Sequence, residues 1–372
     1  MRAFIFILCL SVALASPRID KEAAAACSSD VCKANCRCSS SISPLDLDKT
    51  PQLISLTFDE AIVENLYDLY WEKILTRDNP DDQQIGATFF IPHEYTEYDL
   101  VSDLYNFGYE IGVHSITKTS DQEYWRESDL DTLKQEFGGE RYIISKFANI
   151  PEEDLIGVRT PQLQLNGNVS IQAYTDSNLQ YDSSWPTLPN KPLFPYTLDF
   201  LTTQDCGVAE FCPNEAFKGF WILPIVDLNN NGNGCNNLAD CGQNGTVNEI
   251  KAWLNNQLIK VKETKVPLTL RIGSYWFEQA PNALEAFTSW LDDLKTQEDV
   301  FLVTQKQVLE WIKNPVELSQ FKTDVPDRDR TCKSIKCGPY TNEYGKTIYM
   351  KSCIECPPAY PWLGNPDGNK IN

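Results

Sequence analysis

The chain has 372 residues, a formal net charge of -20, 13 cysteines and only two histidines. So acidic a chain is a poor partner for nucleic acids or anionic membranes, which attract basic proteins. With only two histidines, few catalytic or metal-binding sites that depend on histidine are possible.

The N-terminus has the pattern of a cleaved secretory signal. A basic start precedes an apolar run over 3–14, and small residues stand at Ala13 and Ala15. Residues 1–15 are therefore predicted to be removed. No later run reaches the ~20 apolar residues of a transmembrane helix, so we expect a soluble, secreted, extracellular protein.

Twelve cysteines remain after the predicted signal, which contains Cys9. They are Cys27, Cys32, Cys36, Cys38, Cys206, Cys212, Cys235, Cys241, Cys332, Cys337, Cys353 and Cys356. Such spacings also occur in zinc ribbons, but an oxidising compartment favours disulfides. Twelve cysteines can form at most six disulfides. Asn168 and Asn244 begin possible glycosylation sequons, which predicts a glycoprotein.

Composition divides the mature chain into three parts. Residues 16–50 form a cysteine-rich N-terminal arm, residues 51–315 alternate strands with helices, and residues 316–372 form a cysteine-stapled tail expected to pack on the barrel. Loops 186–219 and 228–245 are predicted to be insertions over one face.

The central part alternates buried-type strands with amphipathic helices. Strands are predicted at 53–58, 87–91, 109–114, 156–158, 179–181, 220–225, 268–272 and 300–303. Helices are predicted at 63–76, 98–107, within 125–147, and at 246–263, 282–296 and 304–313. This alternation predicts an α/β fold, a distorted (β/α) barrel that is closed or nearly closed.

Polar residues follow several of these strands. They are Asp59, Glu60, His93, His114, Arg159 and Asp182. The carboxyl ends of strands in such barrels meet on one face, where functional groups gather. A site is therefore predicted there, although any one of these residues alone is more simply explained as a turn or cap.

Three motifs at these strand ends, 57–60, 114–118 and 159–161, resemble the polysaccharide deacetylases, carbohydrate esterase family 4. Further motifs at 181–184, 195–199, 353–357 and 360–364 resemble the insect chitin deacetylases. The short arm leaves no room for the chitin-binding and low-density-lipoprotein-receptor modules that many of those proteins carry. This resembles the gut-type subgroup associated with the peritrophic matrix.

The resemblance implies metal-assisted hydrolysis of the acetamide on N-acetylglucosamine units. A divalent ion, usually zinc, is held by one Asp and two His, lowers the pKa of bound water and polarises the acetyl carbonyl. Another Asp, tethered by an Arg, is the general base, and a late His is the general acid.

Residue by residue, the resemblance places Asp59 at the general base and Arg159 at its tether. Glu60 stands where the family has the metal-binding Asp, and His114 matches the first metal-binding His. Lys118 occupies the position of the second. The match to the family's ligand set is therefore incomplete.

The general acid is also missing, because alignment on the nearby Pro and Trp-Phe puts Gly273 at its position. Zinc needs three protein ligands and an open position, so we predict no tightly bound zinc and lost or strongly impaired catalysis. We expect the Lys118 ammonium to replace the ion by pairing with the Asp59 or Glu60 carboxylate. Tyr275 is the alternative acid.

Sugar contacts are expected from aromatic and acidic residues near the strand ends. These are Tyr181, Asp182, Trp185, Asp199, Tyr275 and Trp276. Flat rings stack on pyranose faces, and Trp185 is the favoured platform because its loop is polar. Either Asp182 or Asp199 matches the family's partner of the missing acid.

Three functions follow from these patterns. The first is a secreted protein that binds chitin or chitooligosaccharide without efficient deacetylation. The second is an active metal-dependent chitin deacetylase, which Asp59 and Arg159 favour. The third is an interaction protein that contacts other extracellular matrix proteins and leaves its cleft unused.

Overall fold

The computed structural model describes residues 23–33, 35–206, 209, 211–342 and 344–370. The predicted signal lies outside these residues. In the part of the chain described, no helix is long and apolar enough to cross a membrane.

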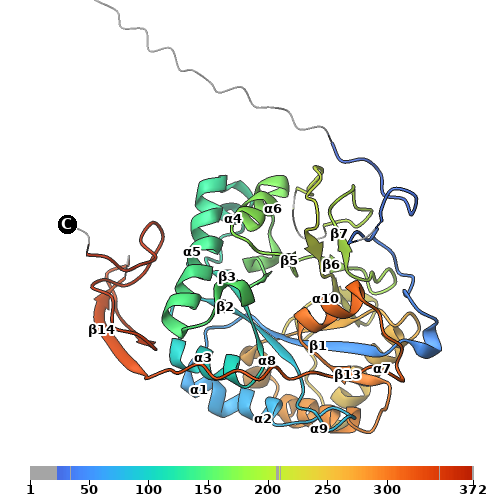
Figure 1. Cartoon of the computed structure of the whole chain (residues 1–372). Coiled ribbons are helices and arrows are strands. Elements are labelled where there is room, and N and C mark those ends of the chain that lie inside the picture. The colour runs from blue at the N-terminus through green and yellow to red at the C-terminus, as the bar shows by residue number, and fades with distance from the viewer. Residues whose placement is uncertain (1–22, 34, 207–208, 210, 343, 371–372) are drawn as a thin grey trace, which may run out of the picture.

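The described residues form a nine-stranded, curled sheet (Figure 1). Its strands are β1 (Gln52–Phe58), β2 (Ala87–Pro92), β3 (Glu110–Ser115), β4 (Gly157–Val158), β5 (Tyr181–Asp182), β7 (Tyr196–Thr197), β8 (Trp221–Ile222), β12 (Leu268–Ile272) and β13 (Val300–Leu302). Their order is β12-β1-β2-β3-β4-β5-β8-β7, with β13 also paired to β1. All pairs are parallel except β7 with β8. The predicted distorted α/β barrel fold is confirmed, but the expectation that it is closed or nearly closed is wrong, because the sheet forms a half-barrel that is open between β12 and β7.

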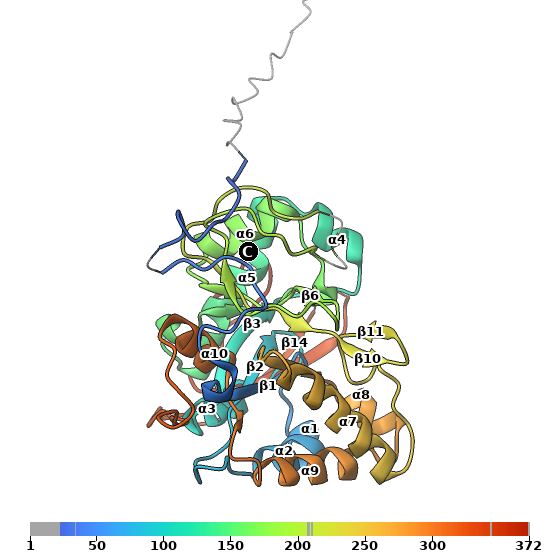
Figure 2. The ribbon, with the colours of Figure 1, turned by 90° about the vertical axis from the view of Figure 1, so that its right-hand side faces the viewer.

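Helices pack around this sheet. They are α1 (Glu64–Leu66), a π-helical turn (Tyr67–Trp71), α2 (Glu72–Leu75), α3 (Tyr98–Asn106), α4 (Gln122–Glu127), α5 (Leu130–Ala148), α6 (Gly167–Asp176), α7 (Val247–Lys262), α8 (Ser274–Gln279), α9 (Ala283–Leu294) and α10 (Gln305–Lys313). In Figure 2, α7, α8 and α9 group at one end of the sheet and α4, α5 and α6 at the other. Every residue of β1 and β2 is buried, as is typical of parallel strands whose two faces are both covered.

Local signals account for several helix starts. Thr246 and Thr304 each form a capping box with the residue three positions on, which satisfies main-chain N–H groups that the first turn leaves open. Asp129 caps α5 by accepting from the Thr132 N–H. α6, α8 and the hairpin of the tail are not among the predicted elements.

Two small ribbons lie in and beside the two insertions. β6 (Pro186–Thr187) pairs in parallel with β9 (Ile225–Val226), and β10 (Leu228–Asn230) forms a hairpin with β11 (Asn233–Cys235). The hairpin turn is Asn231-Gly232, both with positive φ, the conformation that tight hairpins prefer.

All twelve cysteines of the described residues are paired. The disulfides join Cys27 to Cys38, Cys32 to Cys36, Cys206 to Cys212, Cys235 to Cys241, Cys332 to Cys353, and Cys337 to Cys356. The zinc-ribbon alternative for the tail cysteines is thus not the arrangement found. β14 (Ile335–Thr341) and β15 (Thr347–Ser352) form the antiparallel hairpin of the tail, and the last two bonds join Cys332, before β14, and Cys337, within β14, to the residues that follow β15.

His93 fixes the tail to the barrel. Its ring is fully buried, with Nδ1 2.6 Å from the Tyr98 hydroxyl and Nε2 2.8 Å from the Pro361 carbonyl. The ring also packs against Tyr360, with centroids 4.5 Å apart. His93 therefore has a structural role, although it follows a strand as the site residues do.

Candidate functional site

The carboxyl ends of β1, β3 and β12 surround a cavity of about 390 Å³, which we call the cleft. It is lined by Asp59, Glu60, His114, Lys118, Pro161, Gln162, Leu163, Asn236, Asn237, Asp240, Arg271, Ile272 and Gly273. Parallel strands bring residues distant in sequence to this one edge. Most of the lining is polar, and no aromatic residue contributes to it.

Asp59 lies between two guanidinium groups. Its Oδ1 accepts from Arg159 Nη1 at 2.8 Å and its Oδ2 from Arg271 Nε at 3.0 Å. Burial alone raises the pKa of this carboxyl, but the two arginines outweigh burial and hold the pKa well below its usual range. Asp59 is therefore ionised and firmly oriented.

Glu60 is held by the first residue of α8. Ser274 donates to its carboxylate from both the main-chain N–H and the hydroxyl, each at 3.0 Å. Burial raises the pKa of Glu60, and the two Ser274 bonds offset this only in part. Gly273 stands beside them, and a Cβ there would lie 3.7 Å from Glu60 Oε1, an ordinary contact.

His114 is buried, and one of its ring nitrogens is hydrogen-bonded to the main chain. Its Nδ1 lies 2.7 Å from the carbonyl of Arg159, so Nδ1 carries the hydrogen and donates. Burial, assisted by the nearby Lys118 cation, lowers the pKa of His114 to about 3. The imidazole is thus neutral near pH 7, with Nε2 as its acceptor.

Lys118 reaches Asp59 from the turn after β3. Its ammonium donates to the main-chain carbonyl of Asp59, and the described residues show no ion pair between Lys118 and either carboxylate. The expected direct pairing is therefore wrong, because the arginines already hold Asp59 and Ser274 holds Glu60. Burial lowers the pKa of Lys118, although both carboxylates oppose that shift.

A buried glutamate of α5 fixes the turn that carries Lys118. Glu136 accepts from the N–H groups of Ile116 and Thr117 at 3.0 and 2.9 Å, from the Thr117 hydroxyl at 2.5 Å and from the Tyr124 hydroxyl at 2.8 Å. Lys118 itself has a positive φ of 46°. This unfavourable backbone conformation for lysine is imposed by its surroundings.

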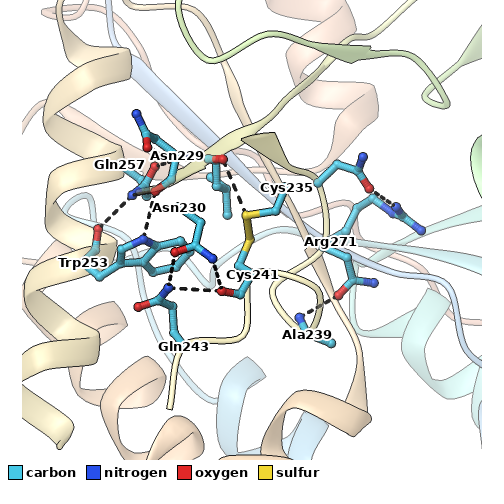
Figure 3. Close-up of a disulfide and its surroundings, with 12 residues drawn as sticks. Asn229, Asn230, Cys235, Ala239, Cys241, Gln243, Trp253, Gln257 and Arg271 are labelled. Carbon is cyan, nitrogen blue, oxygen red and sulfur yellow. Dashed lines mark hydrogen bonds between the residues drawn. A yellow bond between two sulfur atoms is a disulfide. The ribbon is translucent and has the colours of Figure 1, made fainter. Parts of the chain in front are cut away.

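The insertion 228–245 forms another wall of the cleft. Asn236 accepts from Arg271 Nη1 at 2.8 Å, and the Leu238 N–H donates to the Arg271 carbonyl at 3.0 Å. Figure 3 shows the Cys235–Cys241 disulfide between this wall and the side chains that brace it from α7. The loop is therefore cross-linked and tied to β12.

The expected sugar contacts on and after β5 lie elsewhere. Trp185 and Tyr181 are fully buried, Trp185 donating to Asp182 Oδ2 at 2.7 Å and Tyr181 to Glu110 Oε1 at 2.7 Å. Burial raises the pKa of Asp182 to about 7. Trp185 thus offers no exposed face, because its polar loop folds back and its indole is needed to satisfy a buried carboxyl.

The remaining expected contacts also lie outside the cleft lining. Trp276 is buried and donates to the Gln243 carbonyl at 3.0 Å, while Asp199 accepts from the Gly219 N–H at 3.0 Å. Tyr275 is 59% exposed. The structure brings Asp59, Glu60, His114 and Lys118 together, with Arg159 behind Asp59.

The residues absent from the predicted site include Arg271 and Asn236, which line the cleft, and Ser274, which holds Glu60. Arg271 left a signal in the sequence, since one arginine interrupts the otherwise apolar run of β12. A charge within a buried strand requires a partner, and Asp59 is that partner. Asn236 left no comparable signal in a loop rich in asparagine.

The zinc that the family resemblance implies does not fit these residues. Both oxygens of Asp59 are held by arginines, both oxygens of Glu60 by Ser274, and a lysine cation stands beside them. Among the described residues, groups of three potential ligand atoms within 4.8 Å occur only around disulfide cysteines. At the three positions that match the family's metal ligands, 60, 114 and 118, only His114 offers an uncommitted atom, its Nε2, which is too few for a zinc site.

Known proteins resemble this chain closely enough to show its family. Chitin deacetylase 8 of Bombyx mori is 35% identical over 360 residues, covering 92% of this chain and 93% of that protein. Chitin deacetylase 1 of Bombyx mori is 32% identical, covering 94% of this chain and 70% of that protein. No family model matches the chain.

A solved structure supports the fold. A putative polysaccharide deacetylase from Mycobacterium smegmatis aligns with a TM-score of 0.52 and 15% identity, covering 75% of this chain and 95% of that one. This likeness concerns the curled sheet and its helices. With the sequence relatives covering nearly its whole length, the chain belongs to the chitin deacetylase family and has the polysaccharide deacetylase fold.

Proposed function

We propose that this protein is secreted, binds chitin or chitooligosaccharide in its cleft and does not deacetylate it efficiently. The observation that carries the proposal is the state of Asp59, whose two carboxylate oxygens are paired with Arg159 and Arg271 while Lys118 holds its main-chain carbonyl. The relatives named as chitin deacetylases support the ligand class.

Such an aspartate is a poor general base. A base works best when its pKa lies near the operating pH, and two guanidinium groups hold the pKa of Asp59 far below it. Each oxygen also accepts a charge-assisted hydrogen bond from an arginine, which further stabilises the ionised form and weakens Asp59 as a base. The Lys118 ammonium offers donors but does not activate a water as a bound metal ion does.

The leaving amine also lacks an obvious proton donor. Gly273 contributes no side chain, and a general acid typically contributes ~100- to 10,000-fold to a rate. Tyr275 is exposed and outside the cleft lining, and the neutral His114 has its Nδ1 hydrogen committed to Arg159. We therefore assign the cleft to binding.

The cleft suits a neutral polar ligand. Lys118 and Arg271 offer donors, Asp240 offers acceptors, and amides such as Asn237 offer both. Sugar hydroxyls and acetamide groups supply the complementary partners. Contacts with other matrix proteins are the competing proposal, which needs no ligand in the cleft.

Secretion is proposed from two features. The N-terminal sequence resembles a cleaved signal, and six disulfides in the described residues suit an oxidising compartment. Placement in a gut peritrophic matrix rests on the family resemblance alone.

Two measurements on the purified protein test the function. Acetate release from N-acetylglucosamine oligosaccharides, with and without added zinc or cobalt, should stay at background. Titration calorimetry with the same oligosaccharides should show binding. Metal-dependent acetate release would refute the loss of catalysis, and absence of binding would favour the matrix-protein alternative.

A variant sharpens the assay. Lys118→His with Gly273→His restores the two imidazoles that the family pattern has and this chain lacks, and the space beside Gly273 admits a Cβ. We expect this double variant to bind zinc in elemental analysis where the native protein does not. Lys134→His, at a remote site on α5, is the matched control and should bind none.

A further inference from the structure

The chain contains two sequons for N-linked glycosylation, Asn168-Val169-Ser170 and Asn244-Gly245-Thr246. The sequence alone does not distinguish them, because each has a middle residue other than proline and a hydroxyl two positions after the asparagine. A glycan is bulky and lies at the surface, so a folded protein carries one where the asparagine amide points to solvent. The two sites differ in this respect.

The side-chain amide of Asn168 is already used by the fold. Asn168 lies in the first turn of α6, and its Oδ1 accepts from the main-chain N–H groups of Asn214 and Glu215 at 2.8 and 3.1 Å. Its Nδ2 donates to Asn214 Oδ1 at 2.7 Å. The hydroxyl of this sequon belongs to Ser170, which is 1% exposed and accepts from the Asn166 N–H at 2.8 Å. Both polar groups of the sequon therefore stabilise the fold.

The contact between Asn168 and Asn214 joins three parts of the protein. Asn214 belongs to the insertion 186–219, and its carbonyl accepts from the N–H of Ala24 in the N-terminal arm at 2.8 Å. α6, the insertion and the arm therefore meet at this pair of asparagines. A sugar on Asn168 Nδ2 would occupy the space beside Asn214, so a chain modified there could not form this contact.

Asn244 has the opposite surroundings. Its side chain is exposed, and within the part of the chain that the structure describes it forms no hydrogen bond. Its neighbours are nevertheless fixed, because the Gln243 carbonyl accepts from Trp276 Nε1 at 3.0 Å and the Gly245 carbonyl accepts from Asn282 Nδ2 at 2.9 Å. The fold thus holds the main chain on both sides and leaves the amide directed to solvent.

We propose that Asn244 carries an N-linked glycan in the secreted protein and that Asn168 does not. This inference rests on the proposed secretion, through a eukaryotic route, and is independent of ligand binding in the cleft. In the transfer, the anomeric carbon of an oligosaccharide leaves the diphosphate of its lipid-linked donor and bonds to Asn244 Nδ2. The diphosphate keeps the electron pair of the broken bond, and the amide releases one proton.

The fold determines which modified chain leaves the cell. Glycan transfer takes place on the unfolded chain, so both sequons are open to it at that stage. A chain modified at Asn168 loses the contact with Asn214 and should fold poorly and be retained. A chain modified at Asn244 keeps every contact described above and should be secreted.

Mass spectrometry of intact glycopeptides, from protein secreted by cultured eukaryotic cells, tests the site. We expect sugar on the peptide that contains Asn244 and none on the peptide that contains Asn168. Asn-Gly sequences also deamidate spontaneously, so the sugar itself is detected rather than a change of Asn244 to aspartate. A secreted protein with unmodified Asn244, or with sugar on Asn168, would overturn the proposal.

Two variants of Thr246 separate the sequon from the helix cap. Thr246 caps α7 by accepting from the Glu249 N–H at 3.3 Å, and serine and asparagine are both good caps. Thr246→Ser keeps the sequon and should keep the glycan. Thr246→Asn removes the sequon and should lower the mass of the secreted protein by that of one oligosaccharide. Equal glycan mass in the two variants would contradict the assignment to Asn244.

Asn168→Gln is the complementary variant. Its longer side chain cannot keep the bonds to Asn214 and Glu215, so its melting temperature should fall while its glycan mass stays that of the native protein. Loss of sugar in Asn168→Gln would overturn the proposal. Failure of the native protein to leave the cells would overturn the proposed secretion and this inference together, and would leave the proposed binding in the cleft unaffected.

Discussion

Replacing Arg159 with methionine tests the central electrostatic arrangement of the cleft. The guanidinium is fully buried and donates four hydrogen bonds, to the Ser183 carbonyl at 2.7 Å, the Ser183 hydroxyl at 3.0 Å, the Thr57 hydroxyl at 2.7 Å and Asp59 Oδ1 at 2.8 Å. Methionine fills similar space without charge or donors. It leaves Asp59 with only Arg271 and the Ser183 carbonyl without its donor.

The expected cost follows from that loss. Removing one partner of a buried ion pair typically lowers the free energy of unfolding by ~3 to 5 kcal/mol, because the other charge remains buried. Arg271→Met is the matched comparison, since Arg271 contacts the same carboxylate but its side chain is 13% exposed. Losing its hydrogen bonds should cost only ~1 to 3 kcal/mol.

Equilibrium urea unfolding at pH 7, with disulfides intact, measures both costs. Fluorescence and circular dichroism should give the same transition, so that a single free energy applies. We expect Arg159→Met to be the more destabilised variant. An equal or smaller loss than in Arg271→Met would refute the reasoning that the buried Asp59–Arg159 pair anchors this site.

Two other predictions concern neighbouring groups. Because burial lowers the pKa of both His93 and His114 to about 3, neither imidazole should titrate between pH 8 and pH 5. ¹⁵N NMR should show the ring hydrogen on Nε2 of His93 and on Nδ1 of His114. Titration of either ring near pH 6.5 would contradict this prediction. Glu136→Gln should lower the free energy of unfolding by ~1 to 3 kcal/mol, because the new amide nitrogen cannot accept hydrogen bonds from the turn before Lys118. Urea unfolding measures this loss, with the exposed substitution Glu123→Gln as the control. Equal stability of the two variants would contradict the prediction.

Most of the central fold is predictable from the sequence because its strands are apolar runs and its helices have clear periodicity. Strands 53–58 and 268–272 are found at Gln52–Phe58 and Leu268–Ile272. The tail hairpin is different: β15 alternates exposed and buried residues, but the run is short, and two disulfides beside the strands help to hold the hairpin. α6 was missed because it begins with Gly167 and polar residues, a weak helix start.

The site is predictable where chain topology alone places residues. Asp59, His114 and Arg159 follow parallel strands, so their convergence is a property of the fold. Which group a side chain binds is not predictable in the same way, as the hydrogen bonds of Lys118 and Trp185 show. Both depend on which groups are already satisfied by side chains from other elements, and that is a property of packing.

The opening of the sheet beside β12 has a consequence for how this family can change. A free strand edge invites pairing with another molecule, and here the insertion 228–245 covers part of it through the Leu238–Arg271 bond. The same loop supplies Asn236, Asn237 and Asp240 to the cleft. Evolution and engineering therefore cannot shorten this loop to alter ligand choice without also uncovering a template for self-association.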